Sequence, residues 1–160
     1  MLDSKPIEKI LFLDIETTSG KEHFSELTET QKELFLMALR NKGGDKAITD
    51  EEKEEFYSSK APIFAADWGK IICISVGRLI RRESTDTFDM KMVSFYDVDE
   101  KKLLSNFMTK LNSYLNDSSY VFCSHNGFVF DWPIIAKRLI INGIKLPKLL
   151  DYADKNKTVM

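Results

Sequence analysis

The chain has 160 residues, 43% of them hydrophobic, and a formal net charge of −2. This length suits a single domain with a sizeable core, and the near-neutral charge excludes a broad basic surface that would attract nucleic acid. No apolar stretch approaches the ~20 residues needed to cross a bilayer. The two cysteines lie in apolar runs and no signal peptide opens the sequence, so we expect a cytoplasmic protein that is not associated with a membrane.

Residues 7–16 are expected to form the first strand, because their interior is almost continuously apolar. Side chains alternate along a strand, so Asp14 and Glu16 share one face and lie roughly 7 Å apart. Two carboxylates at this spacing can bind a pair of divalent cations about 4 Å apart. The alternative is a strand that simply ends in solvent with two exposed acids.

Residues 21–60 are expected to form a helical insertion between the first two strands. The first helix, over 25–40, ends at a pair of glycines, and its apolar stripe consists of Leu27, Leu34, Phe35 and Ala38. Thr49 and Glu52 have the spacing of a capping box and predict a second helix that ends before Pro62. This insertion is either a solvated surface segment or a lid or partner surface. The second alternative is suggested by apolar residues outside the stripe, namely Leu36, Met37 and Leu39.

Residues 70–80 and 87–96 are expected to form the second and third strands. The connection between them is too short for a crossover helix, so the first three strands should form an antiparallel meander. Asp97 and Glu100 have capping-box spacing and predict the start of a helix. Its apolar side chains recur every 3.6 residues, which indicates core packing: Leu103, Leu104, Phe107, Met108, Leu111, Tyr114 and Leu115.

Residues 120–124 are expected to form a short buried strand that runs parallel to one already in the sheet, because a helical crossover precedes it. Asp131 follows the carboxyl end of this strand, where open α/β sheets bind ligands, and is the third acid that we place at the site. Alternatively Asp131 or Trp132 caps the next helix, with Pro133 in its first turn. A last short strand is expected at 149–150.

These motifs together resemble the DEDD superfamily of DnaQ-like 3′–5′ exonucleases. Residues 12–18, with Asp-x-Glu-Thr, look like its first motif, and residues 126–133, with Asn-Gly followed by Asp, look like its second. Residues 70–77 are similar to the second strand of the branch related to the proofreading domain of family B DNA polymerases. The resemblance implies an α/β, ribonuclease H-like fold with a mixed central sheet flanked by helices, into which 21–60 is inserted.

The resemblance also implies metal-dependent 3′–5′ exonuclease activity on nucleic acid, with the 3′ end of single-stranded DNA as the expected substrate. It implies that Asp14, Glu16 and Asp131 are catalytic residues that bind two Mg²⁺ or Mn²⁺ ions through hard oxygen ligands. A further group would position the terminal nucleotide: Thr17, Thr18, Asn126, Phe128 and Phe130. Either phenylalanine could stack on a base, and core packing is the alternative use of at least one of them.

The family's third motif, a Tyr or His followed by a fourth carboxylate on a late helix, has no match after Asp131. Asp151 and Asp154 come too early and in a polar tail. We therefore expect a single exonuclease-like domain over 1–160 that is incomplete at its C-terminus, or a protein partner or second chain that completes the site. A non-catalytic nucleic-acid- or protein-binding module of the same fold is the second hypothesis. A phosphatase with Asp14 as nucleophile is the third, although such sites usually have Asp where Glu16 stands.

Overall fold

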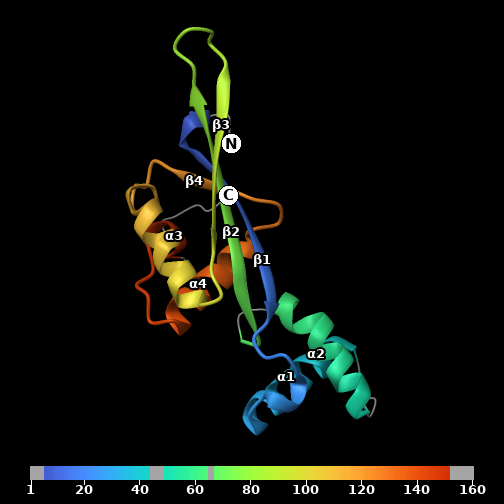
Figure 1. Cartoon of the computed structure of the whole chain (residues 1–160). Coiled ribbons are helices and arrows are strands. Elements are labelled where there is room, and N and C mark those ends of the chain that lie inside the picture. The colour runs from blue at the N-terminus through green and yellow to red at the C-terminus, as the bar shows by residue number, and fades with distance from the viewer. Residues whose placement is uncertain (1–5, 44–48, 65–66, 152–160) are drawn as a thin grey trace. The chain divides into compact units, whose positions relative to one another are not determined.

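The computed structural model describes residues 6–43, 49–64 and 67–151 (Figure 1). Within them the chain folds as two compact units. The first unit consists of the described residues up to Glu16 and from Ile71 onward, and the second unit is Thr17–Lys70. Each unit has its own core.

A four-stranded mixed sheet forms the centre of the first unit, although the end of β1 after Glu16 and the start of β2 before Ile71 belong to the second unit. Its strands are β1 (Ile10–Ser19), β2 (Gly69–Arg81), β3 (Phe88–Tyr96) and β4 (Val121–Cys123). Their order is β3-β2-β1-β4, with β2 antiparallel to β3 and β1 parallel to β4. This arrangement confirms the predicted α/β class, the mixed sheet and the parallel placement of the strand after the crossover.

Alternation along β1 separates an apolar face from a polar one. Leu11, Leu13 and Ile15 are all buried, whereas Asp14 and Glu16 are exposed. The period of two therefore directs both carboxylates away from the core, as the sequence predicts. The strand begins three residues later than predicted, because Ile7–Lys9 forms a turn of 3-10 helix.

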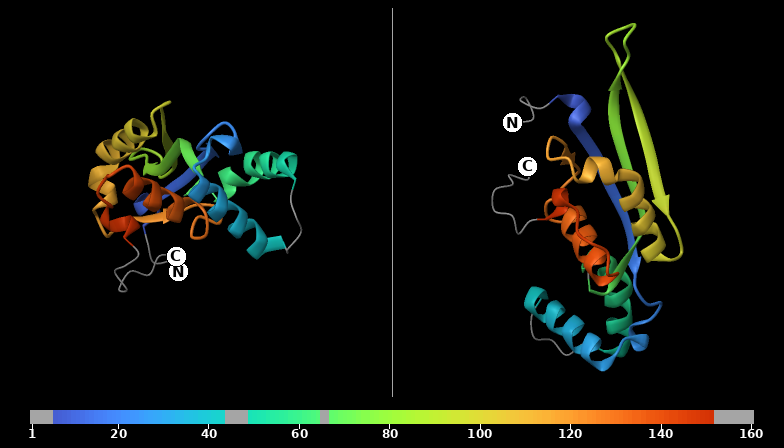
Figure 2. Two further views of the ribbon diagram at one scale, coloured as in Figure 1. Left: turned by 90° about the horizontal axis from the view of Figure 1, so that it is seen from below. Right: turned by 90° about the vertical axis from the view of Figure 1, so that its left-hand side faces the viewer.

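Helices α3 (Glu100–Leu115) and α4 (Asp131–Ile141) lie on the same side of the sheet (Figure 2). The predicted apolar stripe of α3 supplies buried side chains, and Phe107 packs edge-on against Phe95 of β3 with ring centroids 5.6 Å apart. Ile135 and Leu139 of α4 are completely buried. The core of the first unit is therefore the layer between these helices and one face of the sheet.

Glu100 has a different role from the predicted capping box. The cap of α3 is Asp99, whose carboxylate accepts the amides of Lys101 and Lys102. Glu100 is only 8% exposed, accepts the amide of Ile71 at 2.7 Å and forms an ion pair with Arg138 of α4. A buried carboxylate needs such partners, so Glu100 joins β2, α3 and α4 instead of closing its own helix turn.

The second unit is built around aromatic rings. Its helices are α1 (Glu29–Gly43) and α2 (Asp50–Phe64), and its core cluster comprises Phe24, Leu27, Phe35, Tyr57 and Ala61. Leu36, Leu39 and Trp68 pack against this cluster. The prediction that Leu34 belongs to the buried stripe is wrong, because its side chain is 51% exposed while Phe35 is fully buried.

Two predictions about local structure need correction. Pro62 lies inside α2 and not beyond its end, where it has no amide to donate to the carbonyl one turn earlier. Residues Lys148–Leu150 form a 3-10 turn in place of the predicted strand at 149–150. The capping box of α2 is confirmed, since Thr49 and Glu52 exchange hydrogen bonds between side chain and amide.

Candidate functional site

Asp14 lies where β1 leaves the buried part of the sheet. Leu13 and Ile15 on either side of it are buried at 4% and 6% exposure, so they fix the backbone between them. The carboxylate of Asp14 then projects from the face opposite α3 and α4. Glu16 projects from the same face, two residues further along the strand.

Asp131 is the first residue of α4 and is only 2% exposed. Burial raises the pKa of its carboxyl above the usual 3.8, and the negative charge of Asp14 raises it further. Hydrogen bonds from its own amide and from the amide of Ile15, together with the nearby His125, act in the opposite direction. The structure therefore brings Asp131 close enough to Asp14 for the two carboxylates to repel each other.

The loop between β4 and α4 is tightly folded around Gly127. A Cβ atom at this position would lie 1.6 Å from Ser124 Oγ and 3.0 Å from Trp132 Nε1, so only glycine fits. Asn126 has a φ of +56°, and its carbonyl accepts the amides of Val129 and Phe130. This geometry explains the Asn-Gly pair physically and places the start of α4, with Asp131, beside β1.

The predicted nucleotide-positioning residues of this loop have different environments. Asn126 is exposed, and Phe128 is 62% exposed with its ring edge-on to Trp132 at 6.4 Å between centroids. Phe130 is half-buried and immediately precedes α4. Asn126 and Phe128 are therefore accessible to a ligand, and Phe130 is less accessible.

Thr17 and Thr18 belong to the second unit. The hydroxyl of Thr17 donates a hydrogen bond to the carbonyl of Pro62 at 2.9 Å, and both threonines are half-buried. This bond satisfies the Pro62 carbonyl near the end of α2. The Thr17 hydroxyl is therefore already engaged within its own unit.

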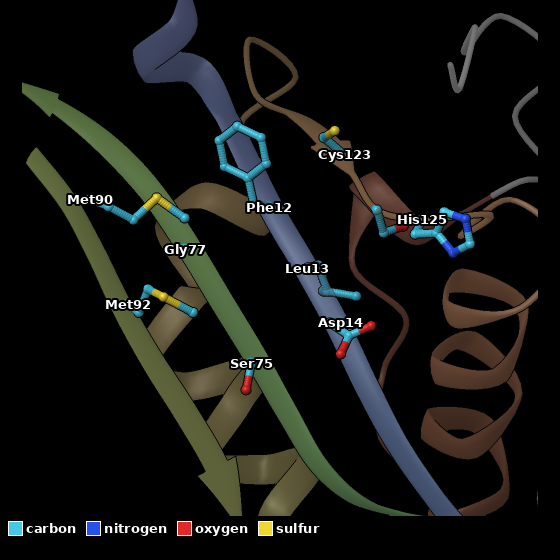
Figure 3. A pocket seen from close by; sticks show the side chains of 10 residues that line it. Phe12, Leu13, Asp14, Ser75, Gly77, Met90, Met92, Cys123 and His125 are labelled. Carbon is cyan, nitrogen blue, oxygen red and sulfur yellow. The ribbon is translucent and has the colours of Figure 1, made fainter. Parts of the chain in front are cut away.

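A cavity of about 470 Å³ opens on the face of the sheet that carries Asp14 (Figure 3). Its lining includes Phe12, Asp14, Ser75, Met90, Met92 and His125. Sequence reasoning missed the two methionines, although their alternate positions in β3 place them on one face. Gly77 makes room for them, because a Cβ there would lie 2.3 Å from the terminal methyl of Met90.

Comparison with protein families gives a match over almost the whole chain. The family described as DNA polymerase family B, exonuclease domain, matches residues 2–158. This chain belongs to that family. No curated protein and no solved structure matched the chain. Every helix of the exonuclease domain that lies within the described residues is too short or too polar to span a bilayer.

Exonuclease domains of this family typically use divalent metals. The oxygen-bearing side chains of this domain meet part of what such a metal requires. Asp14 and Asp131 supply oxygen ligands that repel each other, which a shared cation would relieve. Within residues 6–43, 49–64 and 67–151, however, no three acidic, histidine or cysteine side chains converge as a complete ligand set. Two of the three predicted ligands thus lie near each other, and Glu16 does not complete a cluster with them.

Proposed function

We propose that this exonuclease domain removes nucleotides from the 3′ end of a nucleic-acid strand by metal-dependent hydrolysis, with Asp14, Glu16 and Asp131 as its metal ligands. The observation that supports this most is the approach of Asp14 to the buried Asp131 in a chain of the exonuclease family. Their proximity disfavours the ionised form of Asp131. A shared cation would offset the repulsion between these two carboxylates, which explains why they lie close together.

Two Mg²⁺ or Mn²⁺ ions, when bound, supply an activated water and stabilise charge on the leaving 3′-oxygen. The protein contributes orientation. The buried neighbours of Asp14 hold its carboxylate in place, and the first turn of α4 holds that of Asp131. Glu16 is exposed and free of such packing, so it completes the ligand set by moving toward the other two.

Substrate contacts in this proposal come from the loop before α4. The exposed ring of Phe128 offers a surface on which a base can stack. The exposed side-chain amide of Asn126 can bind a phosphate or base edge. Thr17 and Thr18 remain proposed substrate contacts through their backbone amides, because the Thr17 hydroxyl is engaged with Pro62.

A non-catalytic binding module of the same fold is the second candidate. It is favoured by one observation, that the described residues contain no converged set of three metal-binding side chains. In that case the domain would bind nucleic acid or a protein partner without cutting it. The following experiment separates the two candidates.

The test uses single-stranded DNA labelled at its 5′ end, incubated with the protein and Mn²⁺ and resolved on a denaturing gel. We expect stepwise shortening from the 3′ end that EDTA abolishes and that falls at least about 100-fold in Asp14→Asn and Glu16→Gln. Glu83→Gln is the matched control, because it removes an exposed carboxylate from the turn between β2 and β3. Its activity should equal that of the wild type.

Two outcomes contradict the proposal. Equal shortening by the wild type and Asp14→Asn would remove Asp14 from the chemistry. Retained binding of the DNA by the wild type without any shortening, with Mn²⁺ and with Mg²⁺, would favour the non-catalytic module. A parallel substrate of the same sequence in RNA identifies which nucleic acid is cut.

A further inference from the structure

A row of cations and tyrosines crosses the helix side of the first unit. The Lys9 ammonium lies 4.2 Å from the centroid of the Tyr120 ring, and Tyr120 packs edge-on against Tyr114 with centroids 5.0 Å apart. The guanidinium carbon of Arg78 lies 5.3 Å from the Tyr114 centroid. Lys91 stands directly opposite Arg78 in the β2–β3 pairing. We call these five residues the basic–aromatic row.

Arg78 and Lys91 form an unfavourable pair as they stand. Like charges directly opposite each other on neighbouring strands destabilise a sheet. Among the residues that the structure describes, no ion pair joins either of them to an acid. The neighbouring acids are bound to other cations: Glu8 to Arg81, Asp89 to Arg82 and Asp117 to Lys9. Asp89 interacts with Lys91 only at longer range, through a Coulombic attraction that helps to lower the pKa of Asp89. Arg78 and Lys91 can therefore bind an added anion between them.

A small groove runs beneath these two cations. It has a volume of about 160 Å³ and is bordered by Arg78, Lys91 and Tyr114, with apolar side chains such as Val76 and Leu111 as its floor. Such a floor excludes water from one side of the charged groups and strengthens their interaction with an anion. The tyrosine holds the guanidinium in place through a cation–π contact.

The row is separate from the carboxylates of the candidate site. Arg78 borders a groove that includes Leu11 and Leu111, on the helix side of the sheet, whereas Asp14 borders the cavity on the other face. Lys9 precedes Asp14 by five strand residues, which corresponds to about 16 Å along the chain. A ligand bound at the row therefore does not use the proposed metal ligands.

We propose that the basic–aromatic row binds single-stranded nucleic acid, with Arg78 and Lys91 on neighbouring phosphates and Tyr114 as the residue that positions Arg78. Cationic grooves that alternate with aromatic rings bind single strands by neutralising phosphates and stacking bases. An arginine guanidinium also offers a plane on which a base can stack. The inference deepens the proposed function, because it assigns a contact for the part of the strand that is not at the carboxylates.

The test measures binding of fluorescent oligothymidine to the full chain in EDTA, as a function of NaCl concentration. Each phosphate contact removed should lower the slope of log affinity against log salt by about 0.7. We expect the double variant Arg78→Gln/Lys91→Gln to lose about 1.4 from this slope, and Tyr114→Leu to bind about tenfold more weakly. Lys91→Gln alone should lose about 0.7.

Lys101→Gln is the matched control for Lys91→Gln, because it removes one exposed lysine from the start of α3, about 20 Å along the helix from Tyr114. Its slope should equal that of the wild type. Arg78→Lys keeps the charge and should keep the slope, which separates loss of a contact from loss of folding. Circular dichroism of each variant verifies the fold.

A folded double variant whose slope equals that of Lys101→Gln overturns the inference. So does equal binding of oligothymidine and a polyglutamate peptide, because it indicates an acidic protein as the partner. Because binding is measured in EDTA, the salt slope does not depend on the metal that the proposed nuclease activity requires. Loss of nuclease activity in Asp14→Asn with an unchanged salt slope bears only on the metal site, and a reduced slope in a protein that never cuts DNA supports the row alone.

Discussion

The two units of this domain use different ways to bury a core. The first unit packs regularly spaced and mostly aliphatic side chains of α3 and α4 on one face of the sheet. In the second unit the ring of Phe35 touches those of Phe24, Tyr57 and Trp68 at centroid distances of 5.8, 5.5 and 5.4 Å. With a periodic pattern many side chains each contribute a small part of the stability, whereas in a cluster of a few large rings each ring contributes a large part.

The units also differ in how they satisfy polar groups. In the first unit the buried Glu100 carboxylate binds the Ile71 amide, Arg138 and Asn142. In the second unit the Tyr57 hydroxyl accepts the amide of Lys21 at 3.0 Å, and burial raises the pKa of Tyr57. The first arrangement places a charge in the core and the second a neutral hydroxyl, so loss of a partner should cost more in the first unit.

The largest expected effect is that of Glu100→Ala. Removing this buried carboxylate breaks its ion pair with the half-buried Arg138 and its hydrogen bond from the Ile71 amide, and we expect a loss of about 4 kcal/mol in the free energy of unfolding of the first unit. Urea unfolding followed by circular dichroism measures it. The double variant Glu100→Met/Arg138→Met should recover most of the loss; equal instability of the single and double variants would contradict this account of the pair.

The next effect is that of Phe35→Ala, which removes a ring that contacts Phe24, Tyr57 and Trp68 in the second unit. We expect about 3 kcal/mol of local destabilisation, seen as faster amide hydrogen exchange in α1 and α2 with little change in α3. Leu34→Ala is the matched control, because Leu34 is adjacent to Phe35 in the sequence but its side chain is half exposed. This substitution should lower the free energy of unfolding by less than about 0.5 kcal/mol. Similar exchange in the two variants would show that the ring cluster does not hold this unit.

A smaller effect is expected for Thr49→Ala at the start of α2. The Thr49 hydroxyl accepts the Glu52 amide, and loss of such a cap costs about 1 kcal/mol. The change should appear in the exchange of the first turn of α2 and leave the first unit unaffected. Thr49→Ser retains the hydroxyl and should behave as the wild type, so equal loss in both variants would argue against the cap.

The smallest expected effect is the pH dependence conferred by Asp131. Because its folded pKa is raised above 3.8, the folded state keeps a proton that the unfolded state releases, and stability falls as pH rises from about that value through the raised pKa. In EDTA, Asp131→Asn should therefore be more stable than the wild type at neutral pH and lose this advantage in acid. Thermal melts from pH 3 to 7 measure it, and a variant that is less stable at neutral pH would contradict the sign.

Much of the fold could be predicted because hydrophobic periodicity follows the elements of the first unit closely. The period of two in β1 correctly directs Asp14 and Glu16 away from the core, and the stripe of α3 is buried as expected. The buried residues of the second unit are harder to predict, since the adjacent residues Leu34 and Phe35 have opposite environments. In a short amphipathic helix the choice between two large neighbours depends on which rings the rest of the unit supplies, and no local pattern specifies that.

The candidate site also has one part that the sequence predicts and one part that it does not. The order of the motifs in the chain predicts Asp14, Glu16 and Asp131 as site residues, and their role as ligands stays a prediction. The structure adds that Asp14 lies close enough to Asp131 to raise the pKa of Asp131. The pocket beside Asp14 could not, because Met90 and Met92 become part of it only through their pairing with β2, where Gly77 leaves room. The buried role of Glu100 likewise depends on Arg138, which lies 38 residues away in the sequence.

The claim that Asp14 and Asp131 hold a divalent cation together is tested most directly by calorimetric titration of Mn²⁺ into the intact chain. We predict saturable binding to the wild type and to Glu83→Gln, and affinity at least about tenfold weaker in both Asp14→Asn and Asp131→Asn. Isotherms that are the same for all four proteins, or no binding to the wild type, would contradict the account.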